Sequence, residues 1–460
     1  MPKIKIDKLL YANIFLVISA LIYGLLCFNK KIIHGAAPEW VYGYFGDLSF
    51  KPFYIFFFIA PYLLFFLYLT YKYMHKREVK IILLWFFAGL AFQGLVNTLY
   101  PHSLGAIIQS DMANSFYSPT LKYAPAELLE NFNSIKDDLP LHAKSNMPGK
   151  ILFFYLLGIF TKSPQIMGYL IIAFSNLGAI IVYFICKKLF SDKLIAIYSL
   201  ILYLFIPAKQ YFFPILNTVS PVFILLALFL FIKCLESQKT IYSFLFGLSI
   251  YVMMIFDPLP LSLGIFFLAI LWKYYYEEKI NKSGILKILF YGLISFLLLN
   301  FIIKFTLHFD ILETLLQKVW DSSAFNDAAR SYQVWIIHNL KEFFINAGVT
   351  QSLLFFGLVL LVFYNLIVTL KNRIGTVLSY VAKPEVLLVI AFVSTLLIID
   401  YLGINRGEVT RLWIFLTPFI QIFAAYMCAT KLNKFTFHIV LLSTLLQTTM
   451  TLSMISFIIP

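Results

Sequence analysis

The chain is predicted to be an all-α, polytopic membrane protein, and three features of its composition lead to this prediction. Of its 460 residues, 61% are hydrophobic and only 13% are charged, whereas a soluble domain is about half apolar and about a quarter charged. Phenylalanine and tyrosine are frequent, with 50 and 29 copies. Apolar runs of about 20 residues, the length that crosses a bilayer, recur along the whole chain. This composition excludes a soluble enzyme, a disordered chain and a nucleic-acid-binding domain, in spite of a net charge of +14.

Thirteen apolar segments are expected to be transmembrane helices of a single domain that covers residues 1–460. They lie near residues 9–28, 52–71, 81–98, 164–186, 194–208, 219–233, 240–256, 259–273, 285–306, 352–370, 386–401, 411–430 and 435–458. The first is expected to be a span and not a cleavable signal, because its apolar run is long and no small-residue cleavage site follows it.

The distribution of lysine and arginine predicts the orientation. If the N-terminus lies in the cytoplasm, the short loops on that side carry basic clusters such as Lys76–Arg77 and Lys187–Lys188. Basic residues outnumber acids there and only balance them on the other side, which places the N-terminus inside and the C-terminus outside the plasma membrane. The two long loops, about 99–163 and 307–351, then lie at the outer face. We expect short interfacial helices in these loops and expect the active site on this side.

The first outer loop begins directly after a predicted span, and Asp111 lies near its start. A carboxylate at this boundary can act as a general base for an incoming hydroxyl, although aspartate is also a common helix N-cap. Further along the loop, the sequence leaves three roles open for His142: a catalytic base, a binding ligand or an ordinary loop residue. Lys144 and Lys150 either attract an anionic lipid head or are ordinary interfacial lysines. The run ILFFYLLGIF after Lys150 is too short to span and predicts a surface or re-entrant helix.

The last outer hairpin concentrates charge at the edge of an apolar helix. Arg406, Glu408 and Arg411 lie within six residues, beside Trp413. Charge at membrane depth is costly and usually functional, and two guanidiniums can hold a phosphate through forked hydrogen bonds. Alternatively, Glu408 and Arg411, three residues apart on a helix, form a structural ion pair. Lys209 lies in a proline-punctuated outer turn and is a further candidate for the phosphate.

Other motifs are uninformative or absent. The four cysteines lie in or beside apolar runs and are expected to pack in the interior. The chain contains no Walker loop, GxGxxG, HExxH or GxSxG motif. In the second long loop, IIHNLKEFF is expected to form an amphipathic interfacial helix that covers a substrate or supports an acceptor.

The order of these features resembles the GT-C superfamily of integral membrane glycosyltransferases, which includes the protein O-mannosyltransferases, the lipid A aminoarabinose transferases and the arabinosyltransferases. The resemblance runs, in order, through Asp111, SNMPGKILFFYLLGIF, CKKLFSDK, LFIPA and NRGEVTRLWIFLTPF. The chain has Met147-Pro148 where the family has paired prolines, and a single acid where members carry an acidic pair. No cofactor is therefore predicted, because a divalent metal lacks the acidic pair that would support it.

The resemblance implies an inverting transfer of a sugar from a polyprenyl-phosphate donor to an acceptor hydroxyl at the outer face. The acceptor is a glycan, lipid or protein, membrane lipids surround the chain, and no nucleic acid takes part. Asp111 is the implied general base, and the implied ligands of the donor phosphate are Arg406, Arg411 and Lys209. The supporting residues are expected to be Glu408, His142, Lys144, Lys150 and Tyr117.

Two other functions stay open from the sequence. A polymerase or ligase of lipid-linked surface polysaccharide would depend on arginine or histidine and would tolerate Asp111→Asn. A lipid-linked glycan transporter or flippase would show inverted repeats and charges at mid-membrane. The turn Asp257-Pro258 between two predicted spans is the feature that most favours a transporter.

Overall fold

The structure, a computed structural model, describes residues 6–37, 39–45, 50–372 and 374–460. Twelve helices in this part of the chain are long and apolar enough to cross a membrane, which confirms the prediction of an all-α, multi-pass membrane protein. They are built from α1 (Ile6–Phe28), α2 (Lys51–Tyr73), α3 (Glu78–Asn97), α9 (Pro164–Phe190), α10 (Lys193–Leu204) with α11 (Pro207–Tyr211), α12 (Ser220–Ser237), α14 (Gly264–Tyr276), α15 (Lys282–Leu307), α18 (Val349–Asn372), α20 (Pro384–Tyr401), α22 (Thr417–Tyr426) and α23 (Lys434–Met454).

Polar caps determine where several of these helices begin. The side chains of Ser163, Asp192, Asn281 and Asn433 accept backbone N–H groups in the first turns of α9, α10, α15 and α23. Such caps satisfy donors that have no partner inside the helix. Because each cap stands next to an apolar run, the run and its cap together define the span.

The count of spans differs from the prediction at one segment. Residues 240–256, predicted as a span, form α13 (Thr240–Phe256), an apolar helix of 17 residues that packs along α12 and α15. It is one residue shorter than the shortest of the twelve spans, which have 18 residues with any adjoining 3-10 or π turns included. The short apolar run after Lys150 is helix α8 (Gly149–Phe160), whose 12 residues agree with the predicted surface or re-entrant helix.

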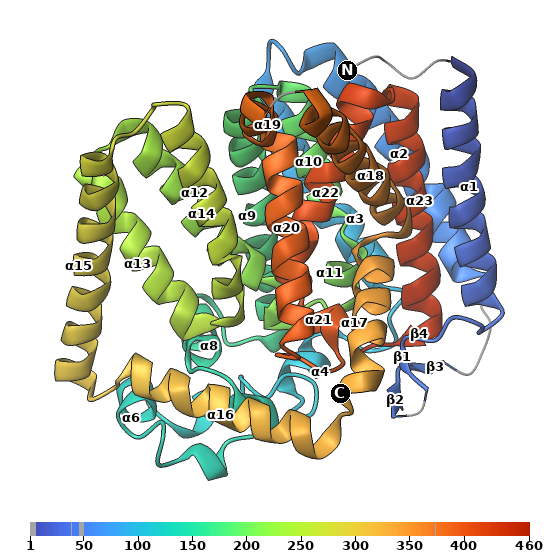
Figure 1. Cartoon of the computed structure of the whole chain (residues 1–460). Coiled ribbons are helices and arrows are strands. Elements are labelled where there is room, and N and C mark those ends of the chain that lie inside the picture. The colour runs from blue at the N-terminus through green and yellow to red at the C-terminus, as the bar shows by residue number, and fades with distance from the viewer. Residues whose placement is uncertain (1–5, 38, 46–49, 373) are drawn as a thin grey trace.

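The long loops gather at one end of the bundle, which we call the loop end. Figure 1 shows α1 starting at the opposite end, whereas the C-terminus lies at the loop end with α4, α8, α16 and α17. The shorter helices are α4 (Leu104–Gln109), α5 (Pro119–Lys122), α6 (Pro125–Glu130), α7 (Leu141–Ser145), α16 (Ile311–Ala329), α17 (Tyr332–Ala347), α19 (Ile374–Val381) and α21 (Val409–Leu412). The 3-10 segments are η1 (Lys136–Asp138), η2 (Leu216–Thr218), η3 (Leu259–Leu263) and η4 (Ile414–Leu416), and η5 (Met427–Lys431) is a π-helix.

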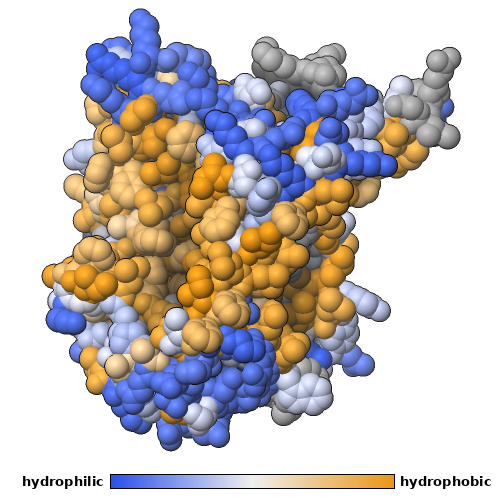
Figure 2. Space-filling model, turned by 90° about the vertical axis from the view of Figure 1, so that its left-hand side faces the viewer, coloured by the Kyte–Doolittle hydropathy of each residue, from blue (hydrophilic) through white to orange (hydrophobic). Residues whose placement is uncertain are grey.

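Two short antiparallel strand pairs also lie at the loop end. Strand β1 (Gly35–Ala36) pairs with β2 (Trp40–Val41), and β3 (Gly43–Tyr44) pairs with β4 (Ile455–Ser456). The second pair ties the segment after α1 to the segment after α23. The core runs through α10, α12, α22 and α23, which are the most enclosed of the spanning helices, while α1, α15 and α18 are peripheral. Figure 2 shows a broad apolar belt between polar surfaces at the two ends.

Candidate functional site

The last hairpin (residues 402–408) is held at the loop end by α17. Asn339 of α17 accepts the backbone N–H of Gly407 at 3.0 Å and donates to the carbonyl of Asn405 at 2.8 Å and to a carboxylate oxygen of Asp400 at 3.2 Å. Gly407 has φ +80°, and a Cβ there would lie 2.9 Å from the ring of Trp335. Glycine therefore lets the hairpin take a left-handed turn directly against α17.

The carboxylate of Glu408 lies between two guanidiniums. Arg411 bonds one oxygen, which confirms the predicted pairing three residues apart, and Arg330 bonds the other at 2.5 Å. Burial alone would raise the pKa of Glu408, but Arg411 and Arg330 hold it at about 2. Arg330 also donates to the carbonyl of Arg406, and Arg406 donates to the carbonyl of Arg330 at 3.1 Å while its guanidinium lies 5.5 Å from the ring of Tyr332.

The first long loop places His142 near the charged cluster formed by Arg330, Arg406, Glu408 and Arg411. Its backbone N–H donates to the Ser115 hydroxyl at 3.3 Å, and its Nε2 is 3.1 Å from the carbonyl of Met112. Burial, with the nearby Arg411 guanidinium, lowers the pKa of His142 to about 4. The imidazole is therefore neutral at pH 7. Because a carbonyl only accepts, the proton belongs on Nε2, which leaves the Nδ1 lone pair available.

Lys150 is a second buried cation of this loop. Its Nζ donates to the side-chain oxygen of Asn146 at 2.9 Å and lies 3.7 Å from Asp257 Oδ2, which also accepts from the Ser220 hydroxyl at 2.5 Å. A Cβ on Gly149 would lie only 2.4 Å from a carbonyl at the end of α13, so the glycine lets α8 reach Asp257. Burial lowers the pKa of Lys150, and Arg411 lowers it further while Asp257 opposes the shift.

Asp111 lies in the turn that holds His142. Its exposed carboxylate accepts the Ser118 hydroxyl, and its carbonyl accepts the Ser115 hydroxyl. Residues 111–114 form a turn, and the next helix, α5, begins only at Pro119, so Asp111 does not have the alternative role of a helix cap. Tyr117, in the same turn, packs edge-on against Phe154 of α8 with 5.8 Å between ring centroids.

The side chains of two other predicted residues, Lys209 and Lys144, make their contacts elsewhere. Lys209 is fully buried, with Nζ 3.9 Å from the ring centroid of Tyr203 and no hydrogen-bond partner among the described residues. The Lys144 side chain points to the exposed Asp137, while its carbonyl accepts from Lys318 at 2.5 Å. The prediction of an outer turn at Lys209 was wrong, because the residue lies in α11, within the candidate span Lys193–Tyr211.

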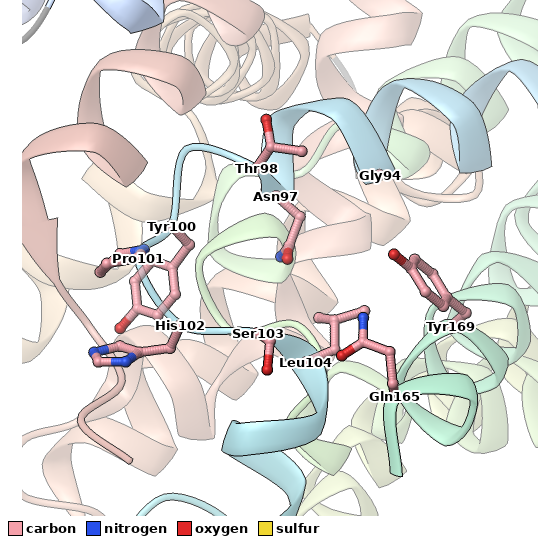
Figure 3. A pocket seen from close by; sticks show the side chains of 10 residues that line it. All are labelled: Gly94, Asn97, Thr98, Tyr100, Pro101, His102, Ser103, Leu104, Gln165 and Tyr169. Atoms are coloured by element: carbon pink, nitrogen blue, oxygen red, sulfur yellow. The ribbon is translucent and has the colours of Figure 1, made fainter. Parts of the chain in front are cut away.

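A polar cavity of about 190 Å³ lies at the opposite end of α4 from Asp111. Figure 3 shows the side chains of Asn97, Ser103, Gln165 and Tyr169 around it, from the end of α3, the following loop and the start of α9. Gln165 accepts the backbone N–H of Gly105 at 2.8 Å. His102 also lines the cavity, and Lys51 donates to the carbonyl of the lining residue Thr98 at 2.6 Å. Amides and hydroxyls of this kind suit a small hydroxylated group.

An apolar groove of about 570 Å³ runs between α17 and α20. Its walls include Ile337, Leu340, Leu397 and Tyr401. The hydroxyl of Tyr332, the residue that lies against Arg406, donates to the carbonyl of Tyr401 at 2.6 Å. The groove therefore ends near Arg406, so that an apolar chain and an anionic group on one molecule could be held together.

Several residues of this region were not singled out by sequence reasoning. Arg330 is 78 positions from Glu408, and Glu342 of α17 is fully buried against the Gly35 N–H and the Thr410 hydroxyl. Burial raises the pKa of Glu342 to about 7. A charged residue at a buried position of an amphipathic helix was the available signal, because α17 places Trp335 and Phe343 on the same buried face.

The raised pKa of Glu342 predicts a pH-dependent stability. The folded chain keeps a proton that the unfolded chain releases above its ordinary pKa of 4.5, so stability is expected to fall as pH rises from about 4.5 to 7. The total loss is roughly 3 kcal/mol. Glu342→Gln should remove this part of the pH dependence. Thermal unfolding in detergent at pH 5 and pH 8 tests the prediction, and equal pH dependence in both proteins would contradict it.

No group of three or more histidine, cysteine, aspartate or glutamate side chains that could hold a metal ion occurs in the described part of the chain. Comparisons of the sequence and structure with protein-family models, curated proteins and solved structures find no match. The fold defines a multi-pass integral membrane protein. Its function must be inferred from the chemistry of the loop end.

Proposed function

We propose that the protein is an inverting GT-C-type glycosyltransferase that moves a sugar from a polyprenyl-phosphate donor to an acceptor hydroxyl at the outer face of the plasma membrane. The proposal rests chiefly on one observation: Arg411 lies close enough to His142 and Lys150 of the first loop to shift their pKa values. Basic groups from distant parts of the chain thus gather beside the turn that carries Asp111. The loop end is the outer face in this proposal, as the charge distribution predicts. Two basic residues of the N-terminus that contribute to that distribution, Lys3 and Lys5, lie outside the described residues.

The donor would enter sideways from the bilayer. Its isoprenoid chain fits the groove between α17 and α20, and its phosphate would meet the arginines at the end of that groove. Arginine suits this role because its planar fork binds phosphate oxygens in pairs and stabilises the charge that develops as the phosphate leaves. Both Arg411 and Arg330 already contact Glu408, so a bound phosphate would share them with this carboxylate.

The transfer itself needs one base. The acceptor oxygen attacks the anomeric carbon from the face opposite the phosphate and forms the new bond as the bond to the phosphate oxygen breaks. The polyprenyl phosphate leaves with the electron pair, and the hydroxyl proton passes to the carboxylate of Asp111. A single displacement of this kind inverts the configuration at the anomeric carbon. The exposed position of Asp111 leaves its carboxylate accessible to an acceptor.

A polymerase or ligase of lipid-linked surface polysaccharide is the second candidate. One observation favours it: besides burial, the charges of Arg411 and Glu408 act on the pKa of His142. In that case a histidine and an arginine would carry the reaction, and His142→Gln would reduce activity far more than Asp111→Asn.

Incubation of the purified protein with a panel of radiolabelled polyprenyl-phosphate sugars tests the main proposal. We expect one donor to be consumed, with release of polyprenyl phosphate. The labelled sugar should be transferred to an acceptor with inversion of configuration at its anomeric carbon. Consumption only of lipid-linked oligosaccharides, with loss of activity in His142→Gln, would support the second candidate instead. A protein that consumes none of the donors would contradict both.

A further inference from the structure

Helix α16 lies across the loop end and has one face buried against the first long loop. It follows α15 directly and runs across the lower ends of the helices in Figure 1. Ile311, Thr314 and Lys318 form its buried face. Lys318 donates to the carbonyl of Lys144 at 2.5 Å, and Lys136 pairs with the helix at Asp321 at 2.5 Å. This face is therefore fully engaged in packing inside the protein.

The opposite face of α16 is apolar and has no partner in the described chain. Leu312, Leu316, Val319 and Trp320 are 46%, 72%, 59% and 78% exposed. The spacing of four, three and one residues places them along one side of the helix. We call these four residues the apolar arc. Glu313 and Gln317 are exposed on the adjoining side, so the helix changes from apolar to polar around its circumference.

Membrane lipid is the occupant that fits the apolar arc. Near the loop end of α15, the preceding spanning helix, Phe301 and Phe305 are exposed on the lipid-facing side. The arc begins at Leu312, seven residues beyond Phe305, so exposed apolar side chains lie on both sides of the bend between α15 and α16. Trp320 at its far end is of the residue type enriched at membrane–water interfaces.

We propose that α16 lies in the lipid interface at the loop end, with its apolar arc immersed among the upper acyl chains. Amphipathic helices of this kind bury their apolar face about 5–10 Å into the boundary between head groups and chains. Because the other face of α16 holds Lys136 and the carbonyl of Lys144, the bilayer would fix the height of the segment that carries His142. The proposal does not depend on the chemistry of sugar transfer.

Paired fluorescent labels in nanodiscs test this placement. Leu316→Cys and the matched control Gln317→Cys are each labelled with an NBD dye in phosphatidylcholine nanodiscs that contain a lipid with a doxyl quencher near the head group. The four native cysteines are buried, and labelled wild-type protein gives the background. We expect the label at position 316 to be quenched several-fold more by lipid, and that at position 317 more by aqueous iodide.

Two results would overturn the proposal. Equal quenching by iodide at both positions would place the arc in water. A label at position 316 that neither lipid nor iodide quenches would show that a second copy or another protein covers the arc. A second measurement needs no label: brominated lipid should quench less of the total tryptophan emission in Trp320→Phe than in the wild type, and an unchanged quenched fraction would contradict the proposal. None of these readouts requires catalysis.

Discussion

Asp111→Asn is expected to lower the rate of sugar transfer by at least about a hundredfold, because general-base help contributes roughly 10²–10⁴ in rate. The substitution keeps the size of the side chain, and the amide oxygen can still accept from Ser118. The turn should therefore survive while the proton acceptor is lost. The measurement is single-turnover transfer from a labelled donor at saturating acceptor, with equal unfolding temperatures as evidence that both proteins are folded.

Asp138→Asn is the matched control for this experiment. Asp138 is an exposed carboxylate of the same loop, at the end of η1, and its loss removes the same charge without touching the turn of His142. We expect it to retain the wild-type rate. Equal activity of Asp111→Asn and Asp138→Asn would exclude Asp111 as the base and would direct attention to His142.

The features that the sequence predicted well are local ones. A membrane span depends on one continuous apolar run, and helix α8 depends on a run that is too short to span. The pair Glu408–Arg411 was predictable because residues three apart on a helix lie side by side. In each case the residues that determine the feature lie within a single helix or a segment of about that length.

The features that were not predictable depend on contacts between distant segments. Arg330 completes the pairing of Glu408 from 78 positions away, and Lys150 of the first loop approaches Asp257 only because α8 packs on the end of α13. For Lys209, the residue type and the outer turn suggested a phosphate ligand, but the chain directs its amine over the Tyr203 ring. Side-chain direction is set by packing, and one sequence does not show packing.

Arg411→Met is expected to weaken use of the donor strongly while leaving the hairpin folded. A hydrogen bond to a charged group contributes about 1.5–3 kcal/mol, so loss of one such contact to phosphate should lower kcat/KM by roughly ten- to a hundredfold. Glu408 keeps its contact with Arg330 in this variant, which limits the effect on stability. Steady-state kinetics with the labelled donor measure the change, and Arg77→Met, at the opposite end of the bundle, is the matched control.

The double variant Glu408→Gln, Arg411→Met separates a phosphate ligand from a structural ion pair. If Arg411 serves only to neutralise Glu408, the double variant should recover much of the activity that Arg411→Met loses. The reason is that the double variant no longer buries a carboxylate that lacks one of its two arginines. If Arg411 binds the donor phosphate, the double variant should stay at least as slow as Arg411→Met. Recovery in the double variant would therefore contradict phosphate binding by Arg411. In the phosphate case Arg411→Lys should fall between wild type and Arg411→Met, since lysine keeps the charge but loses the planar fork.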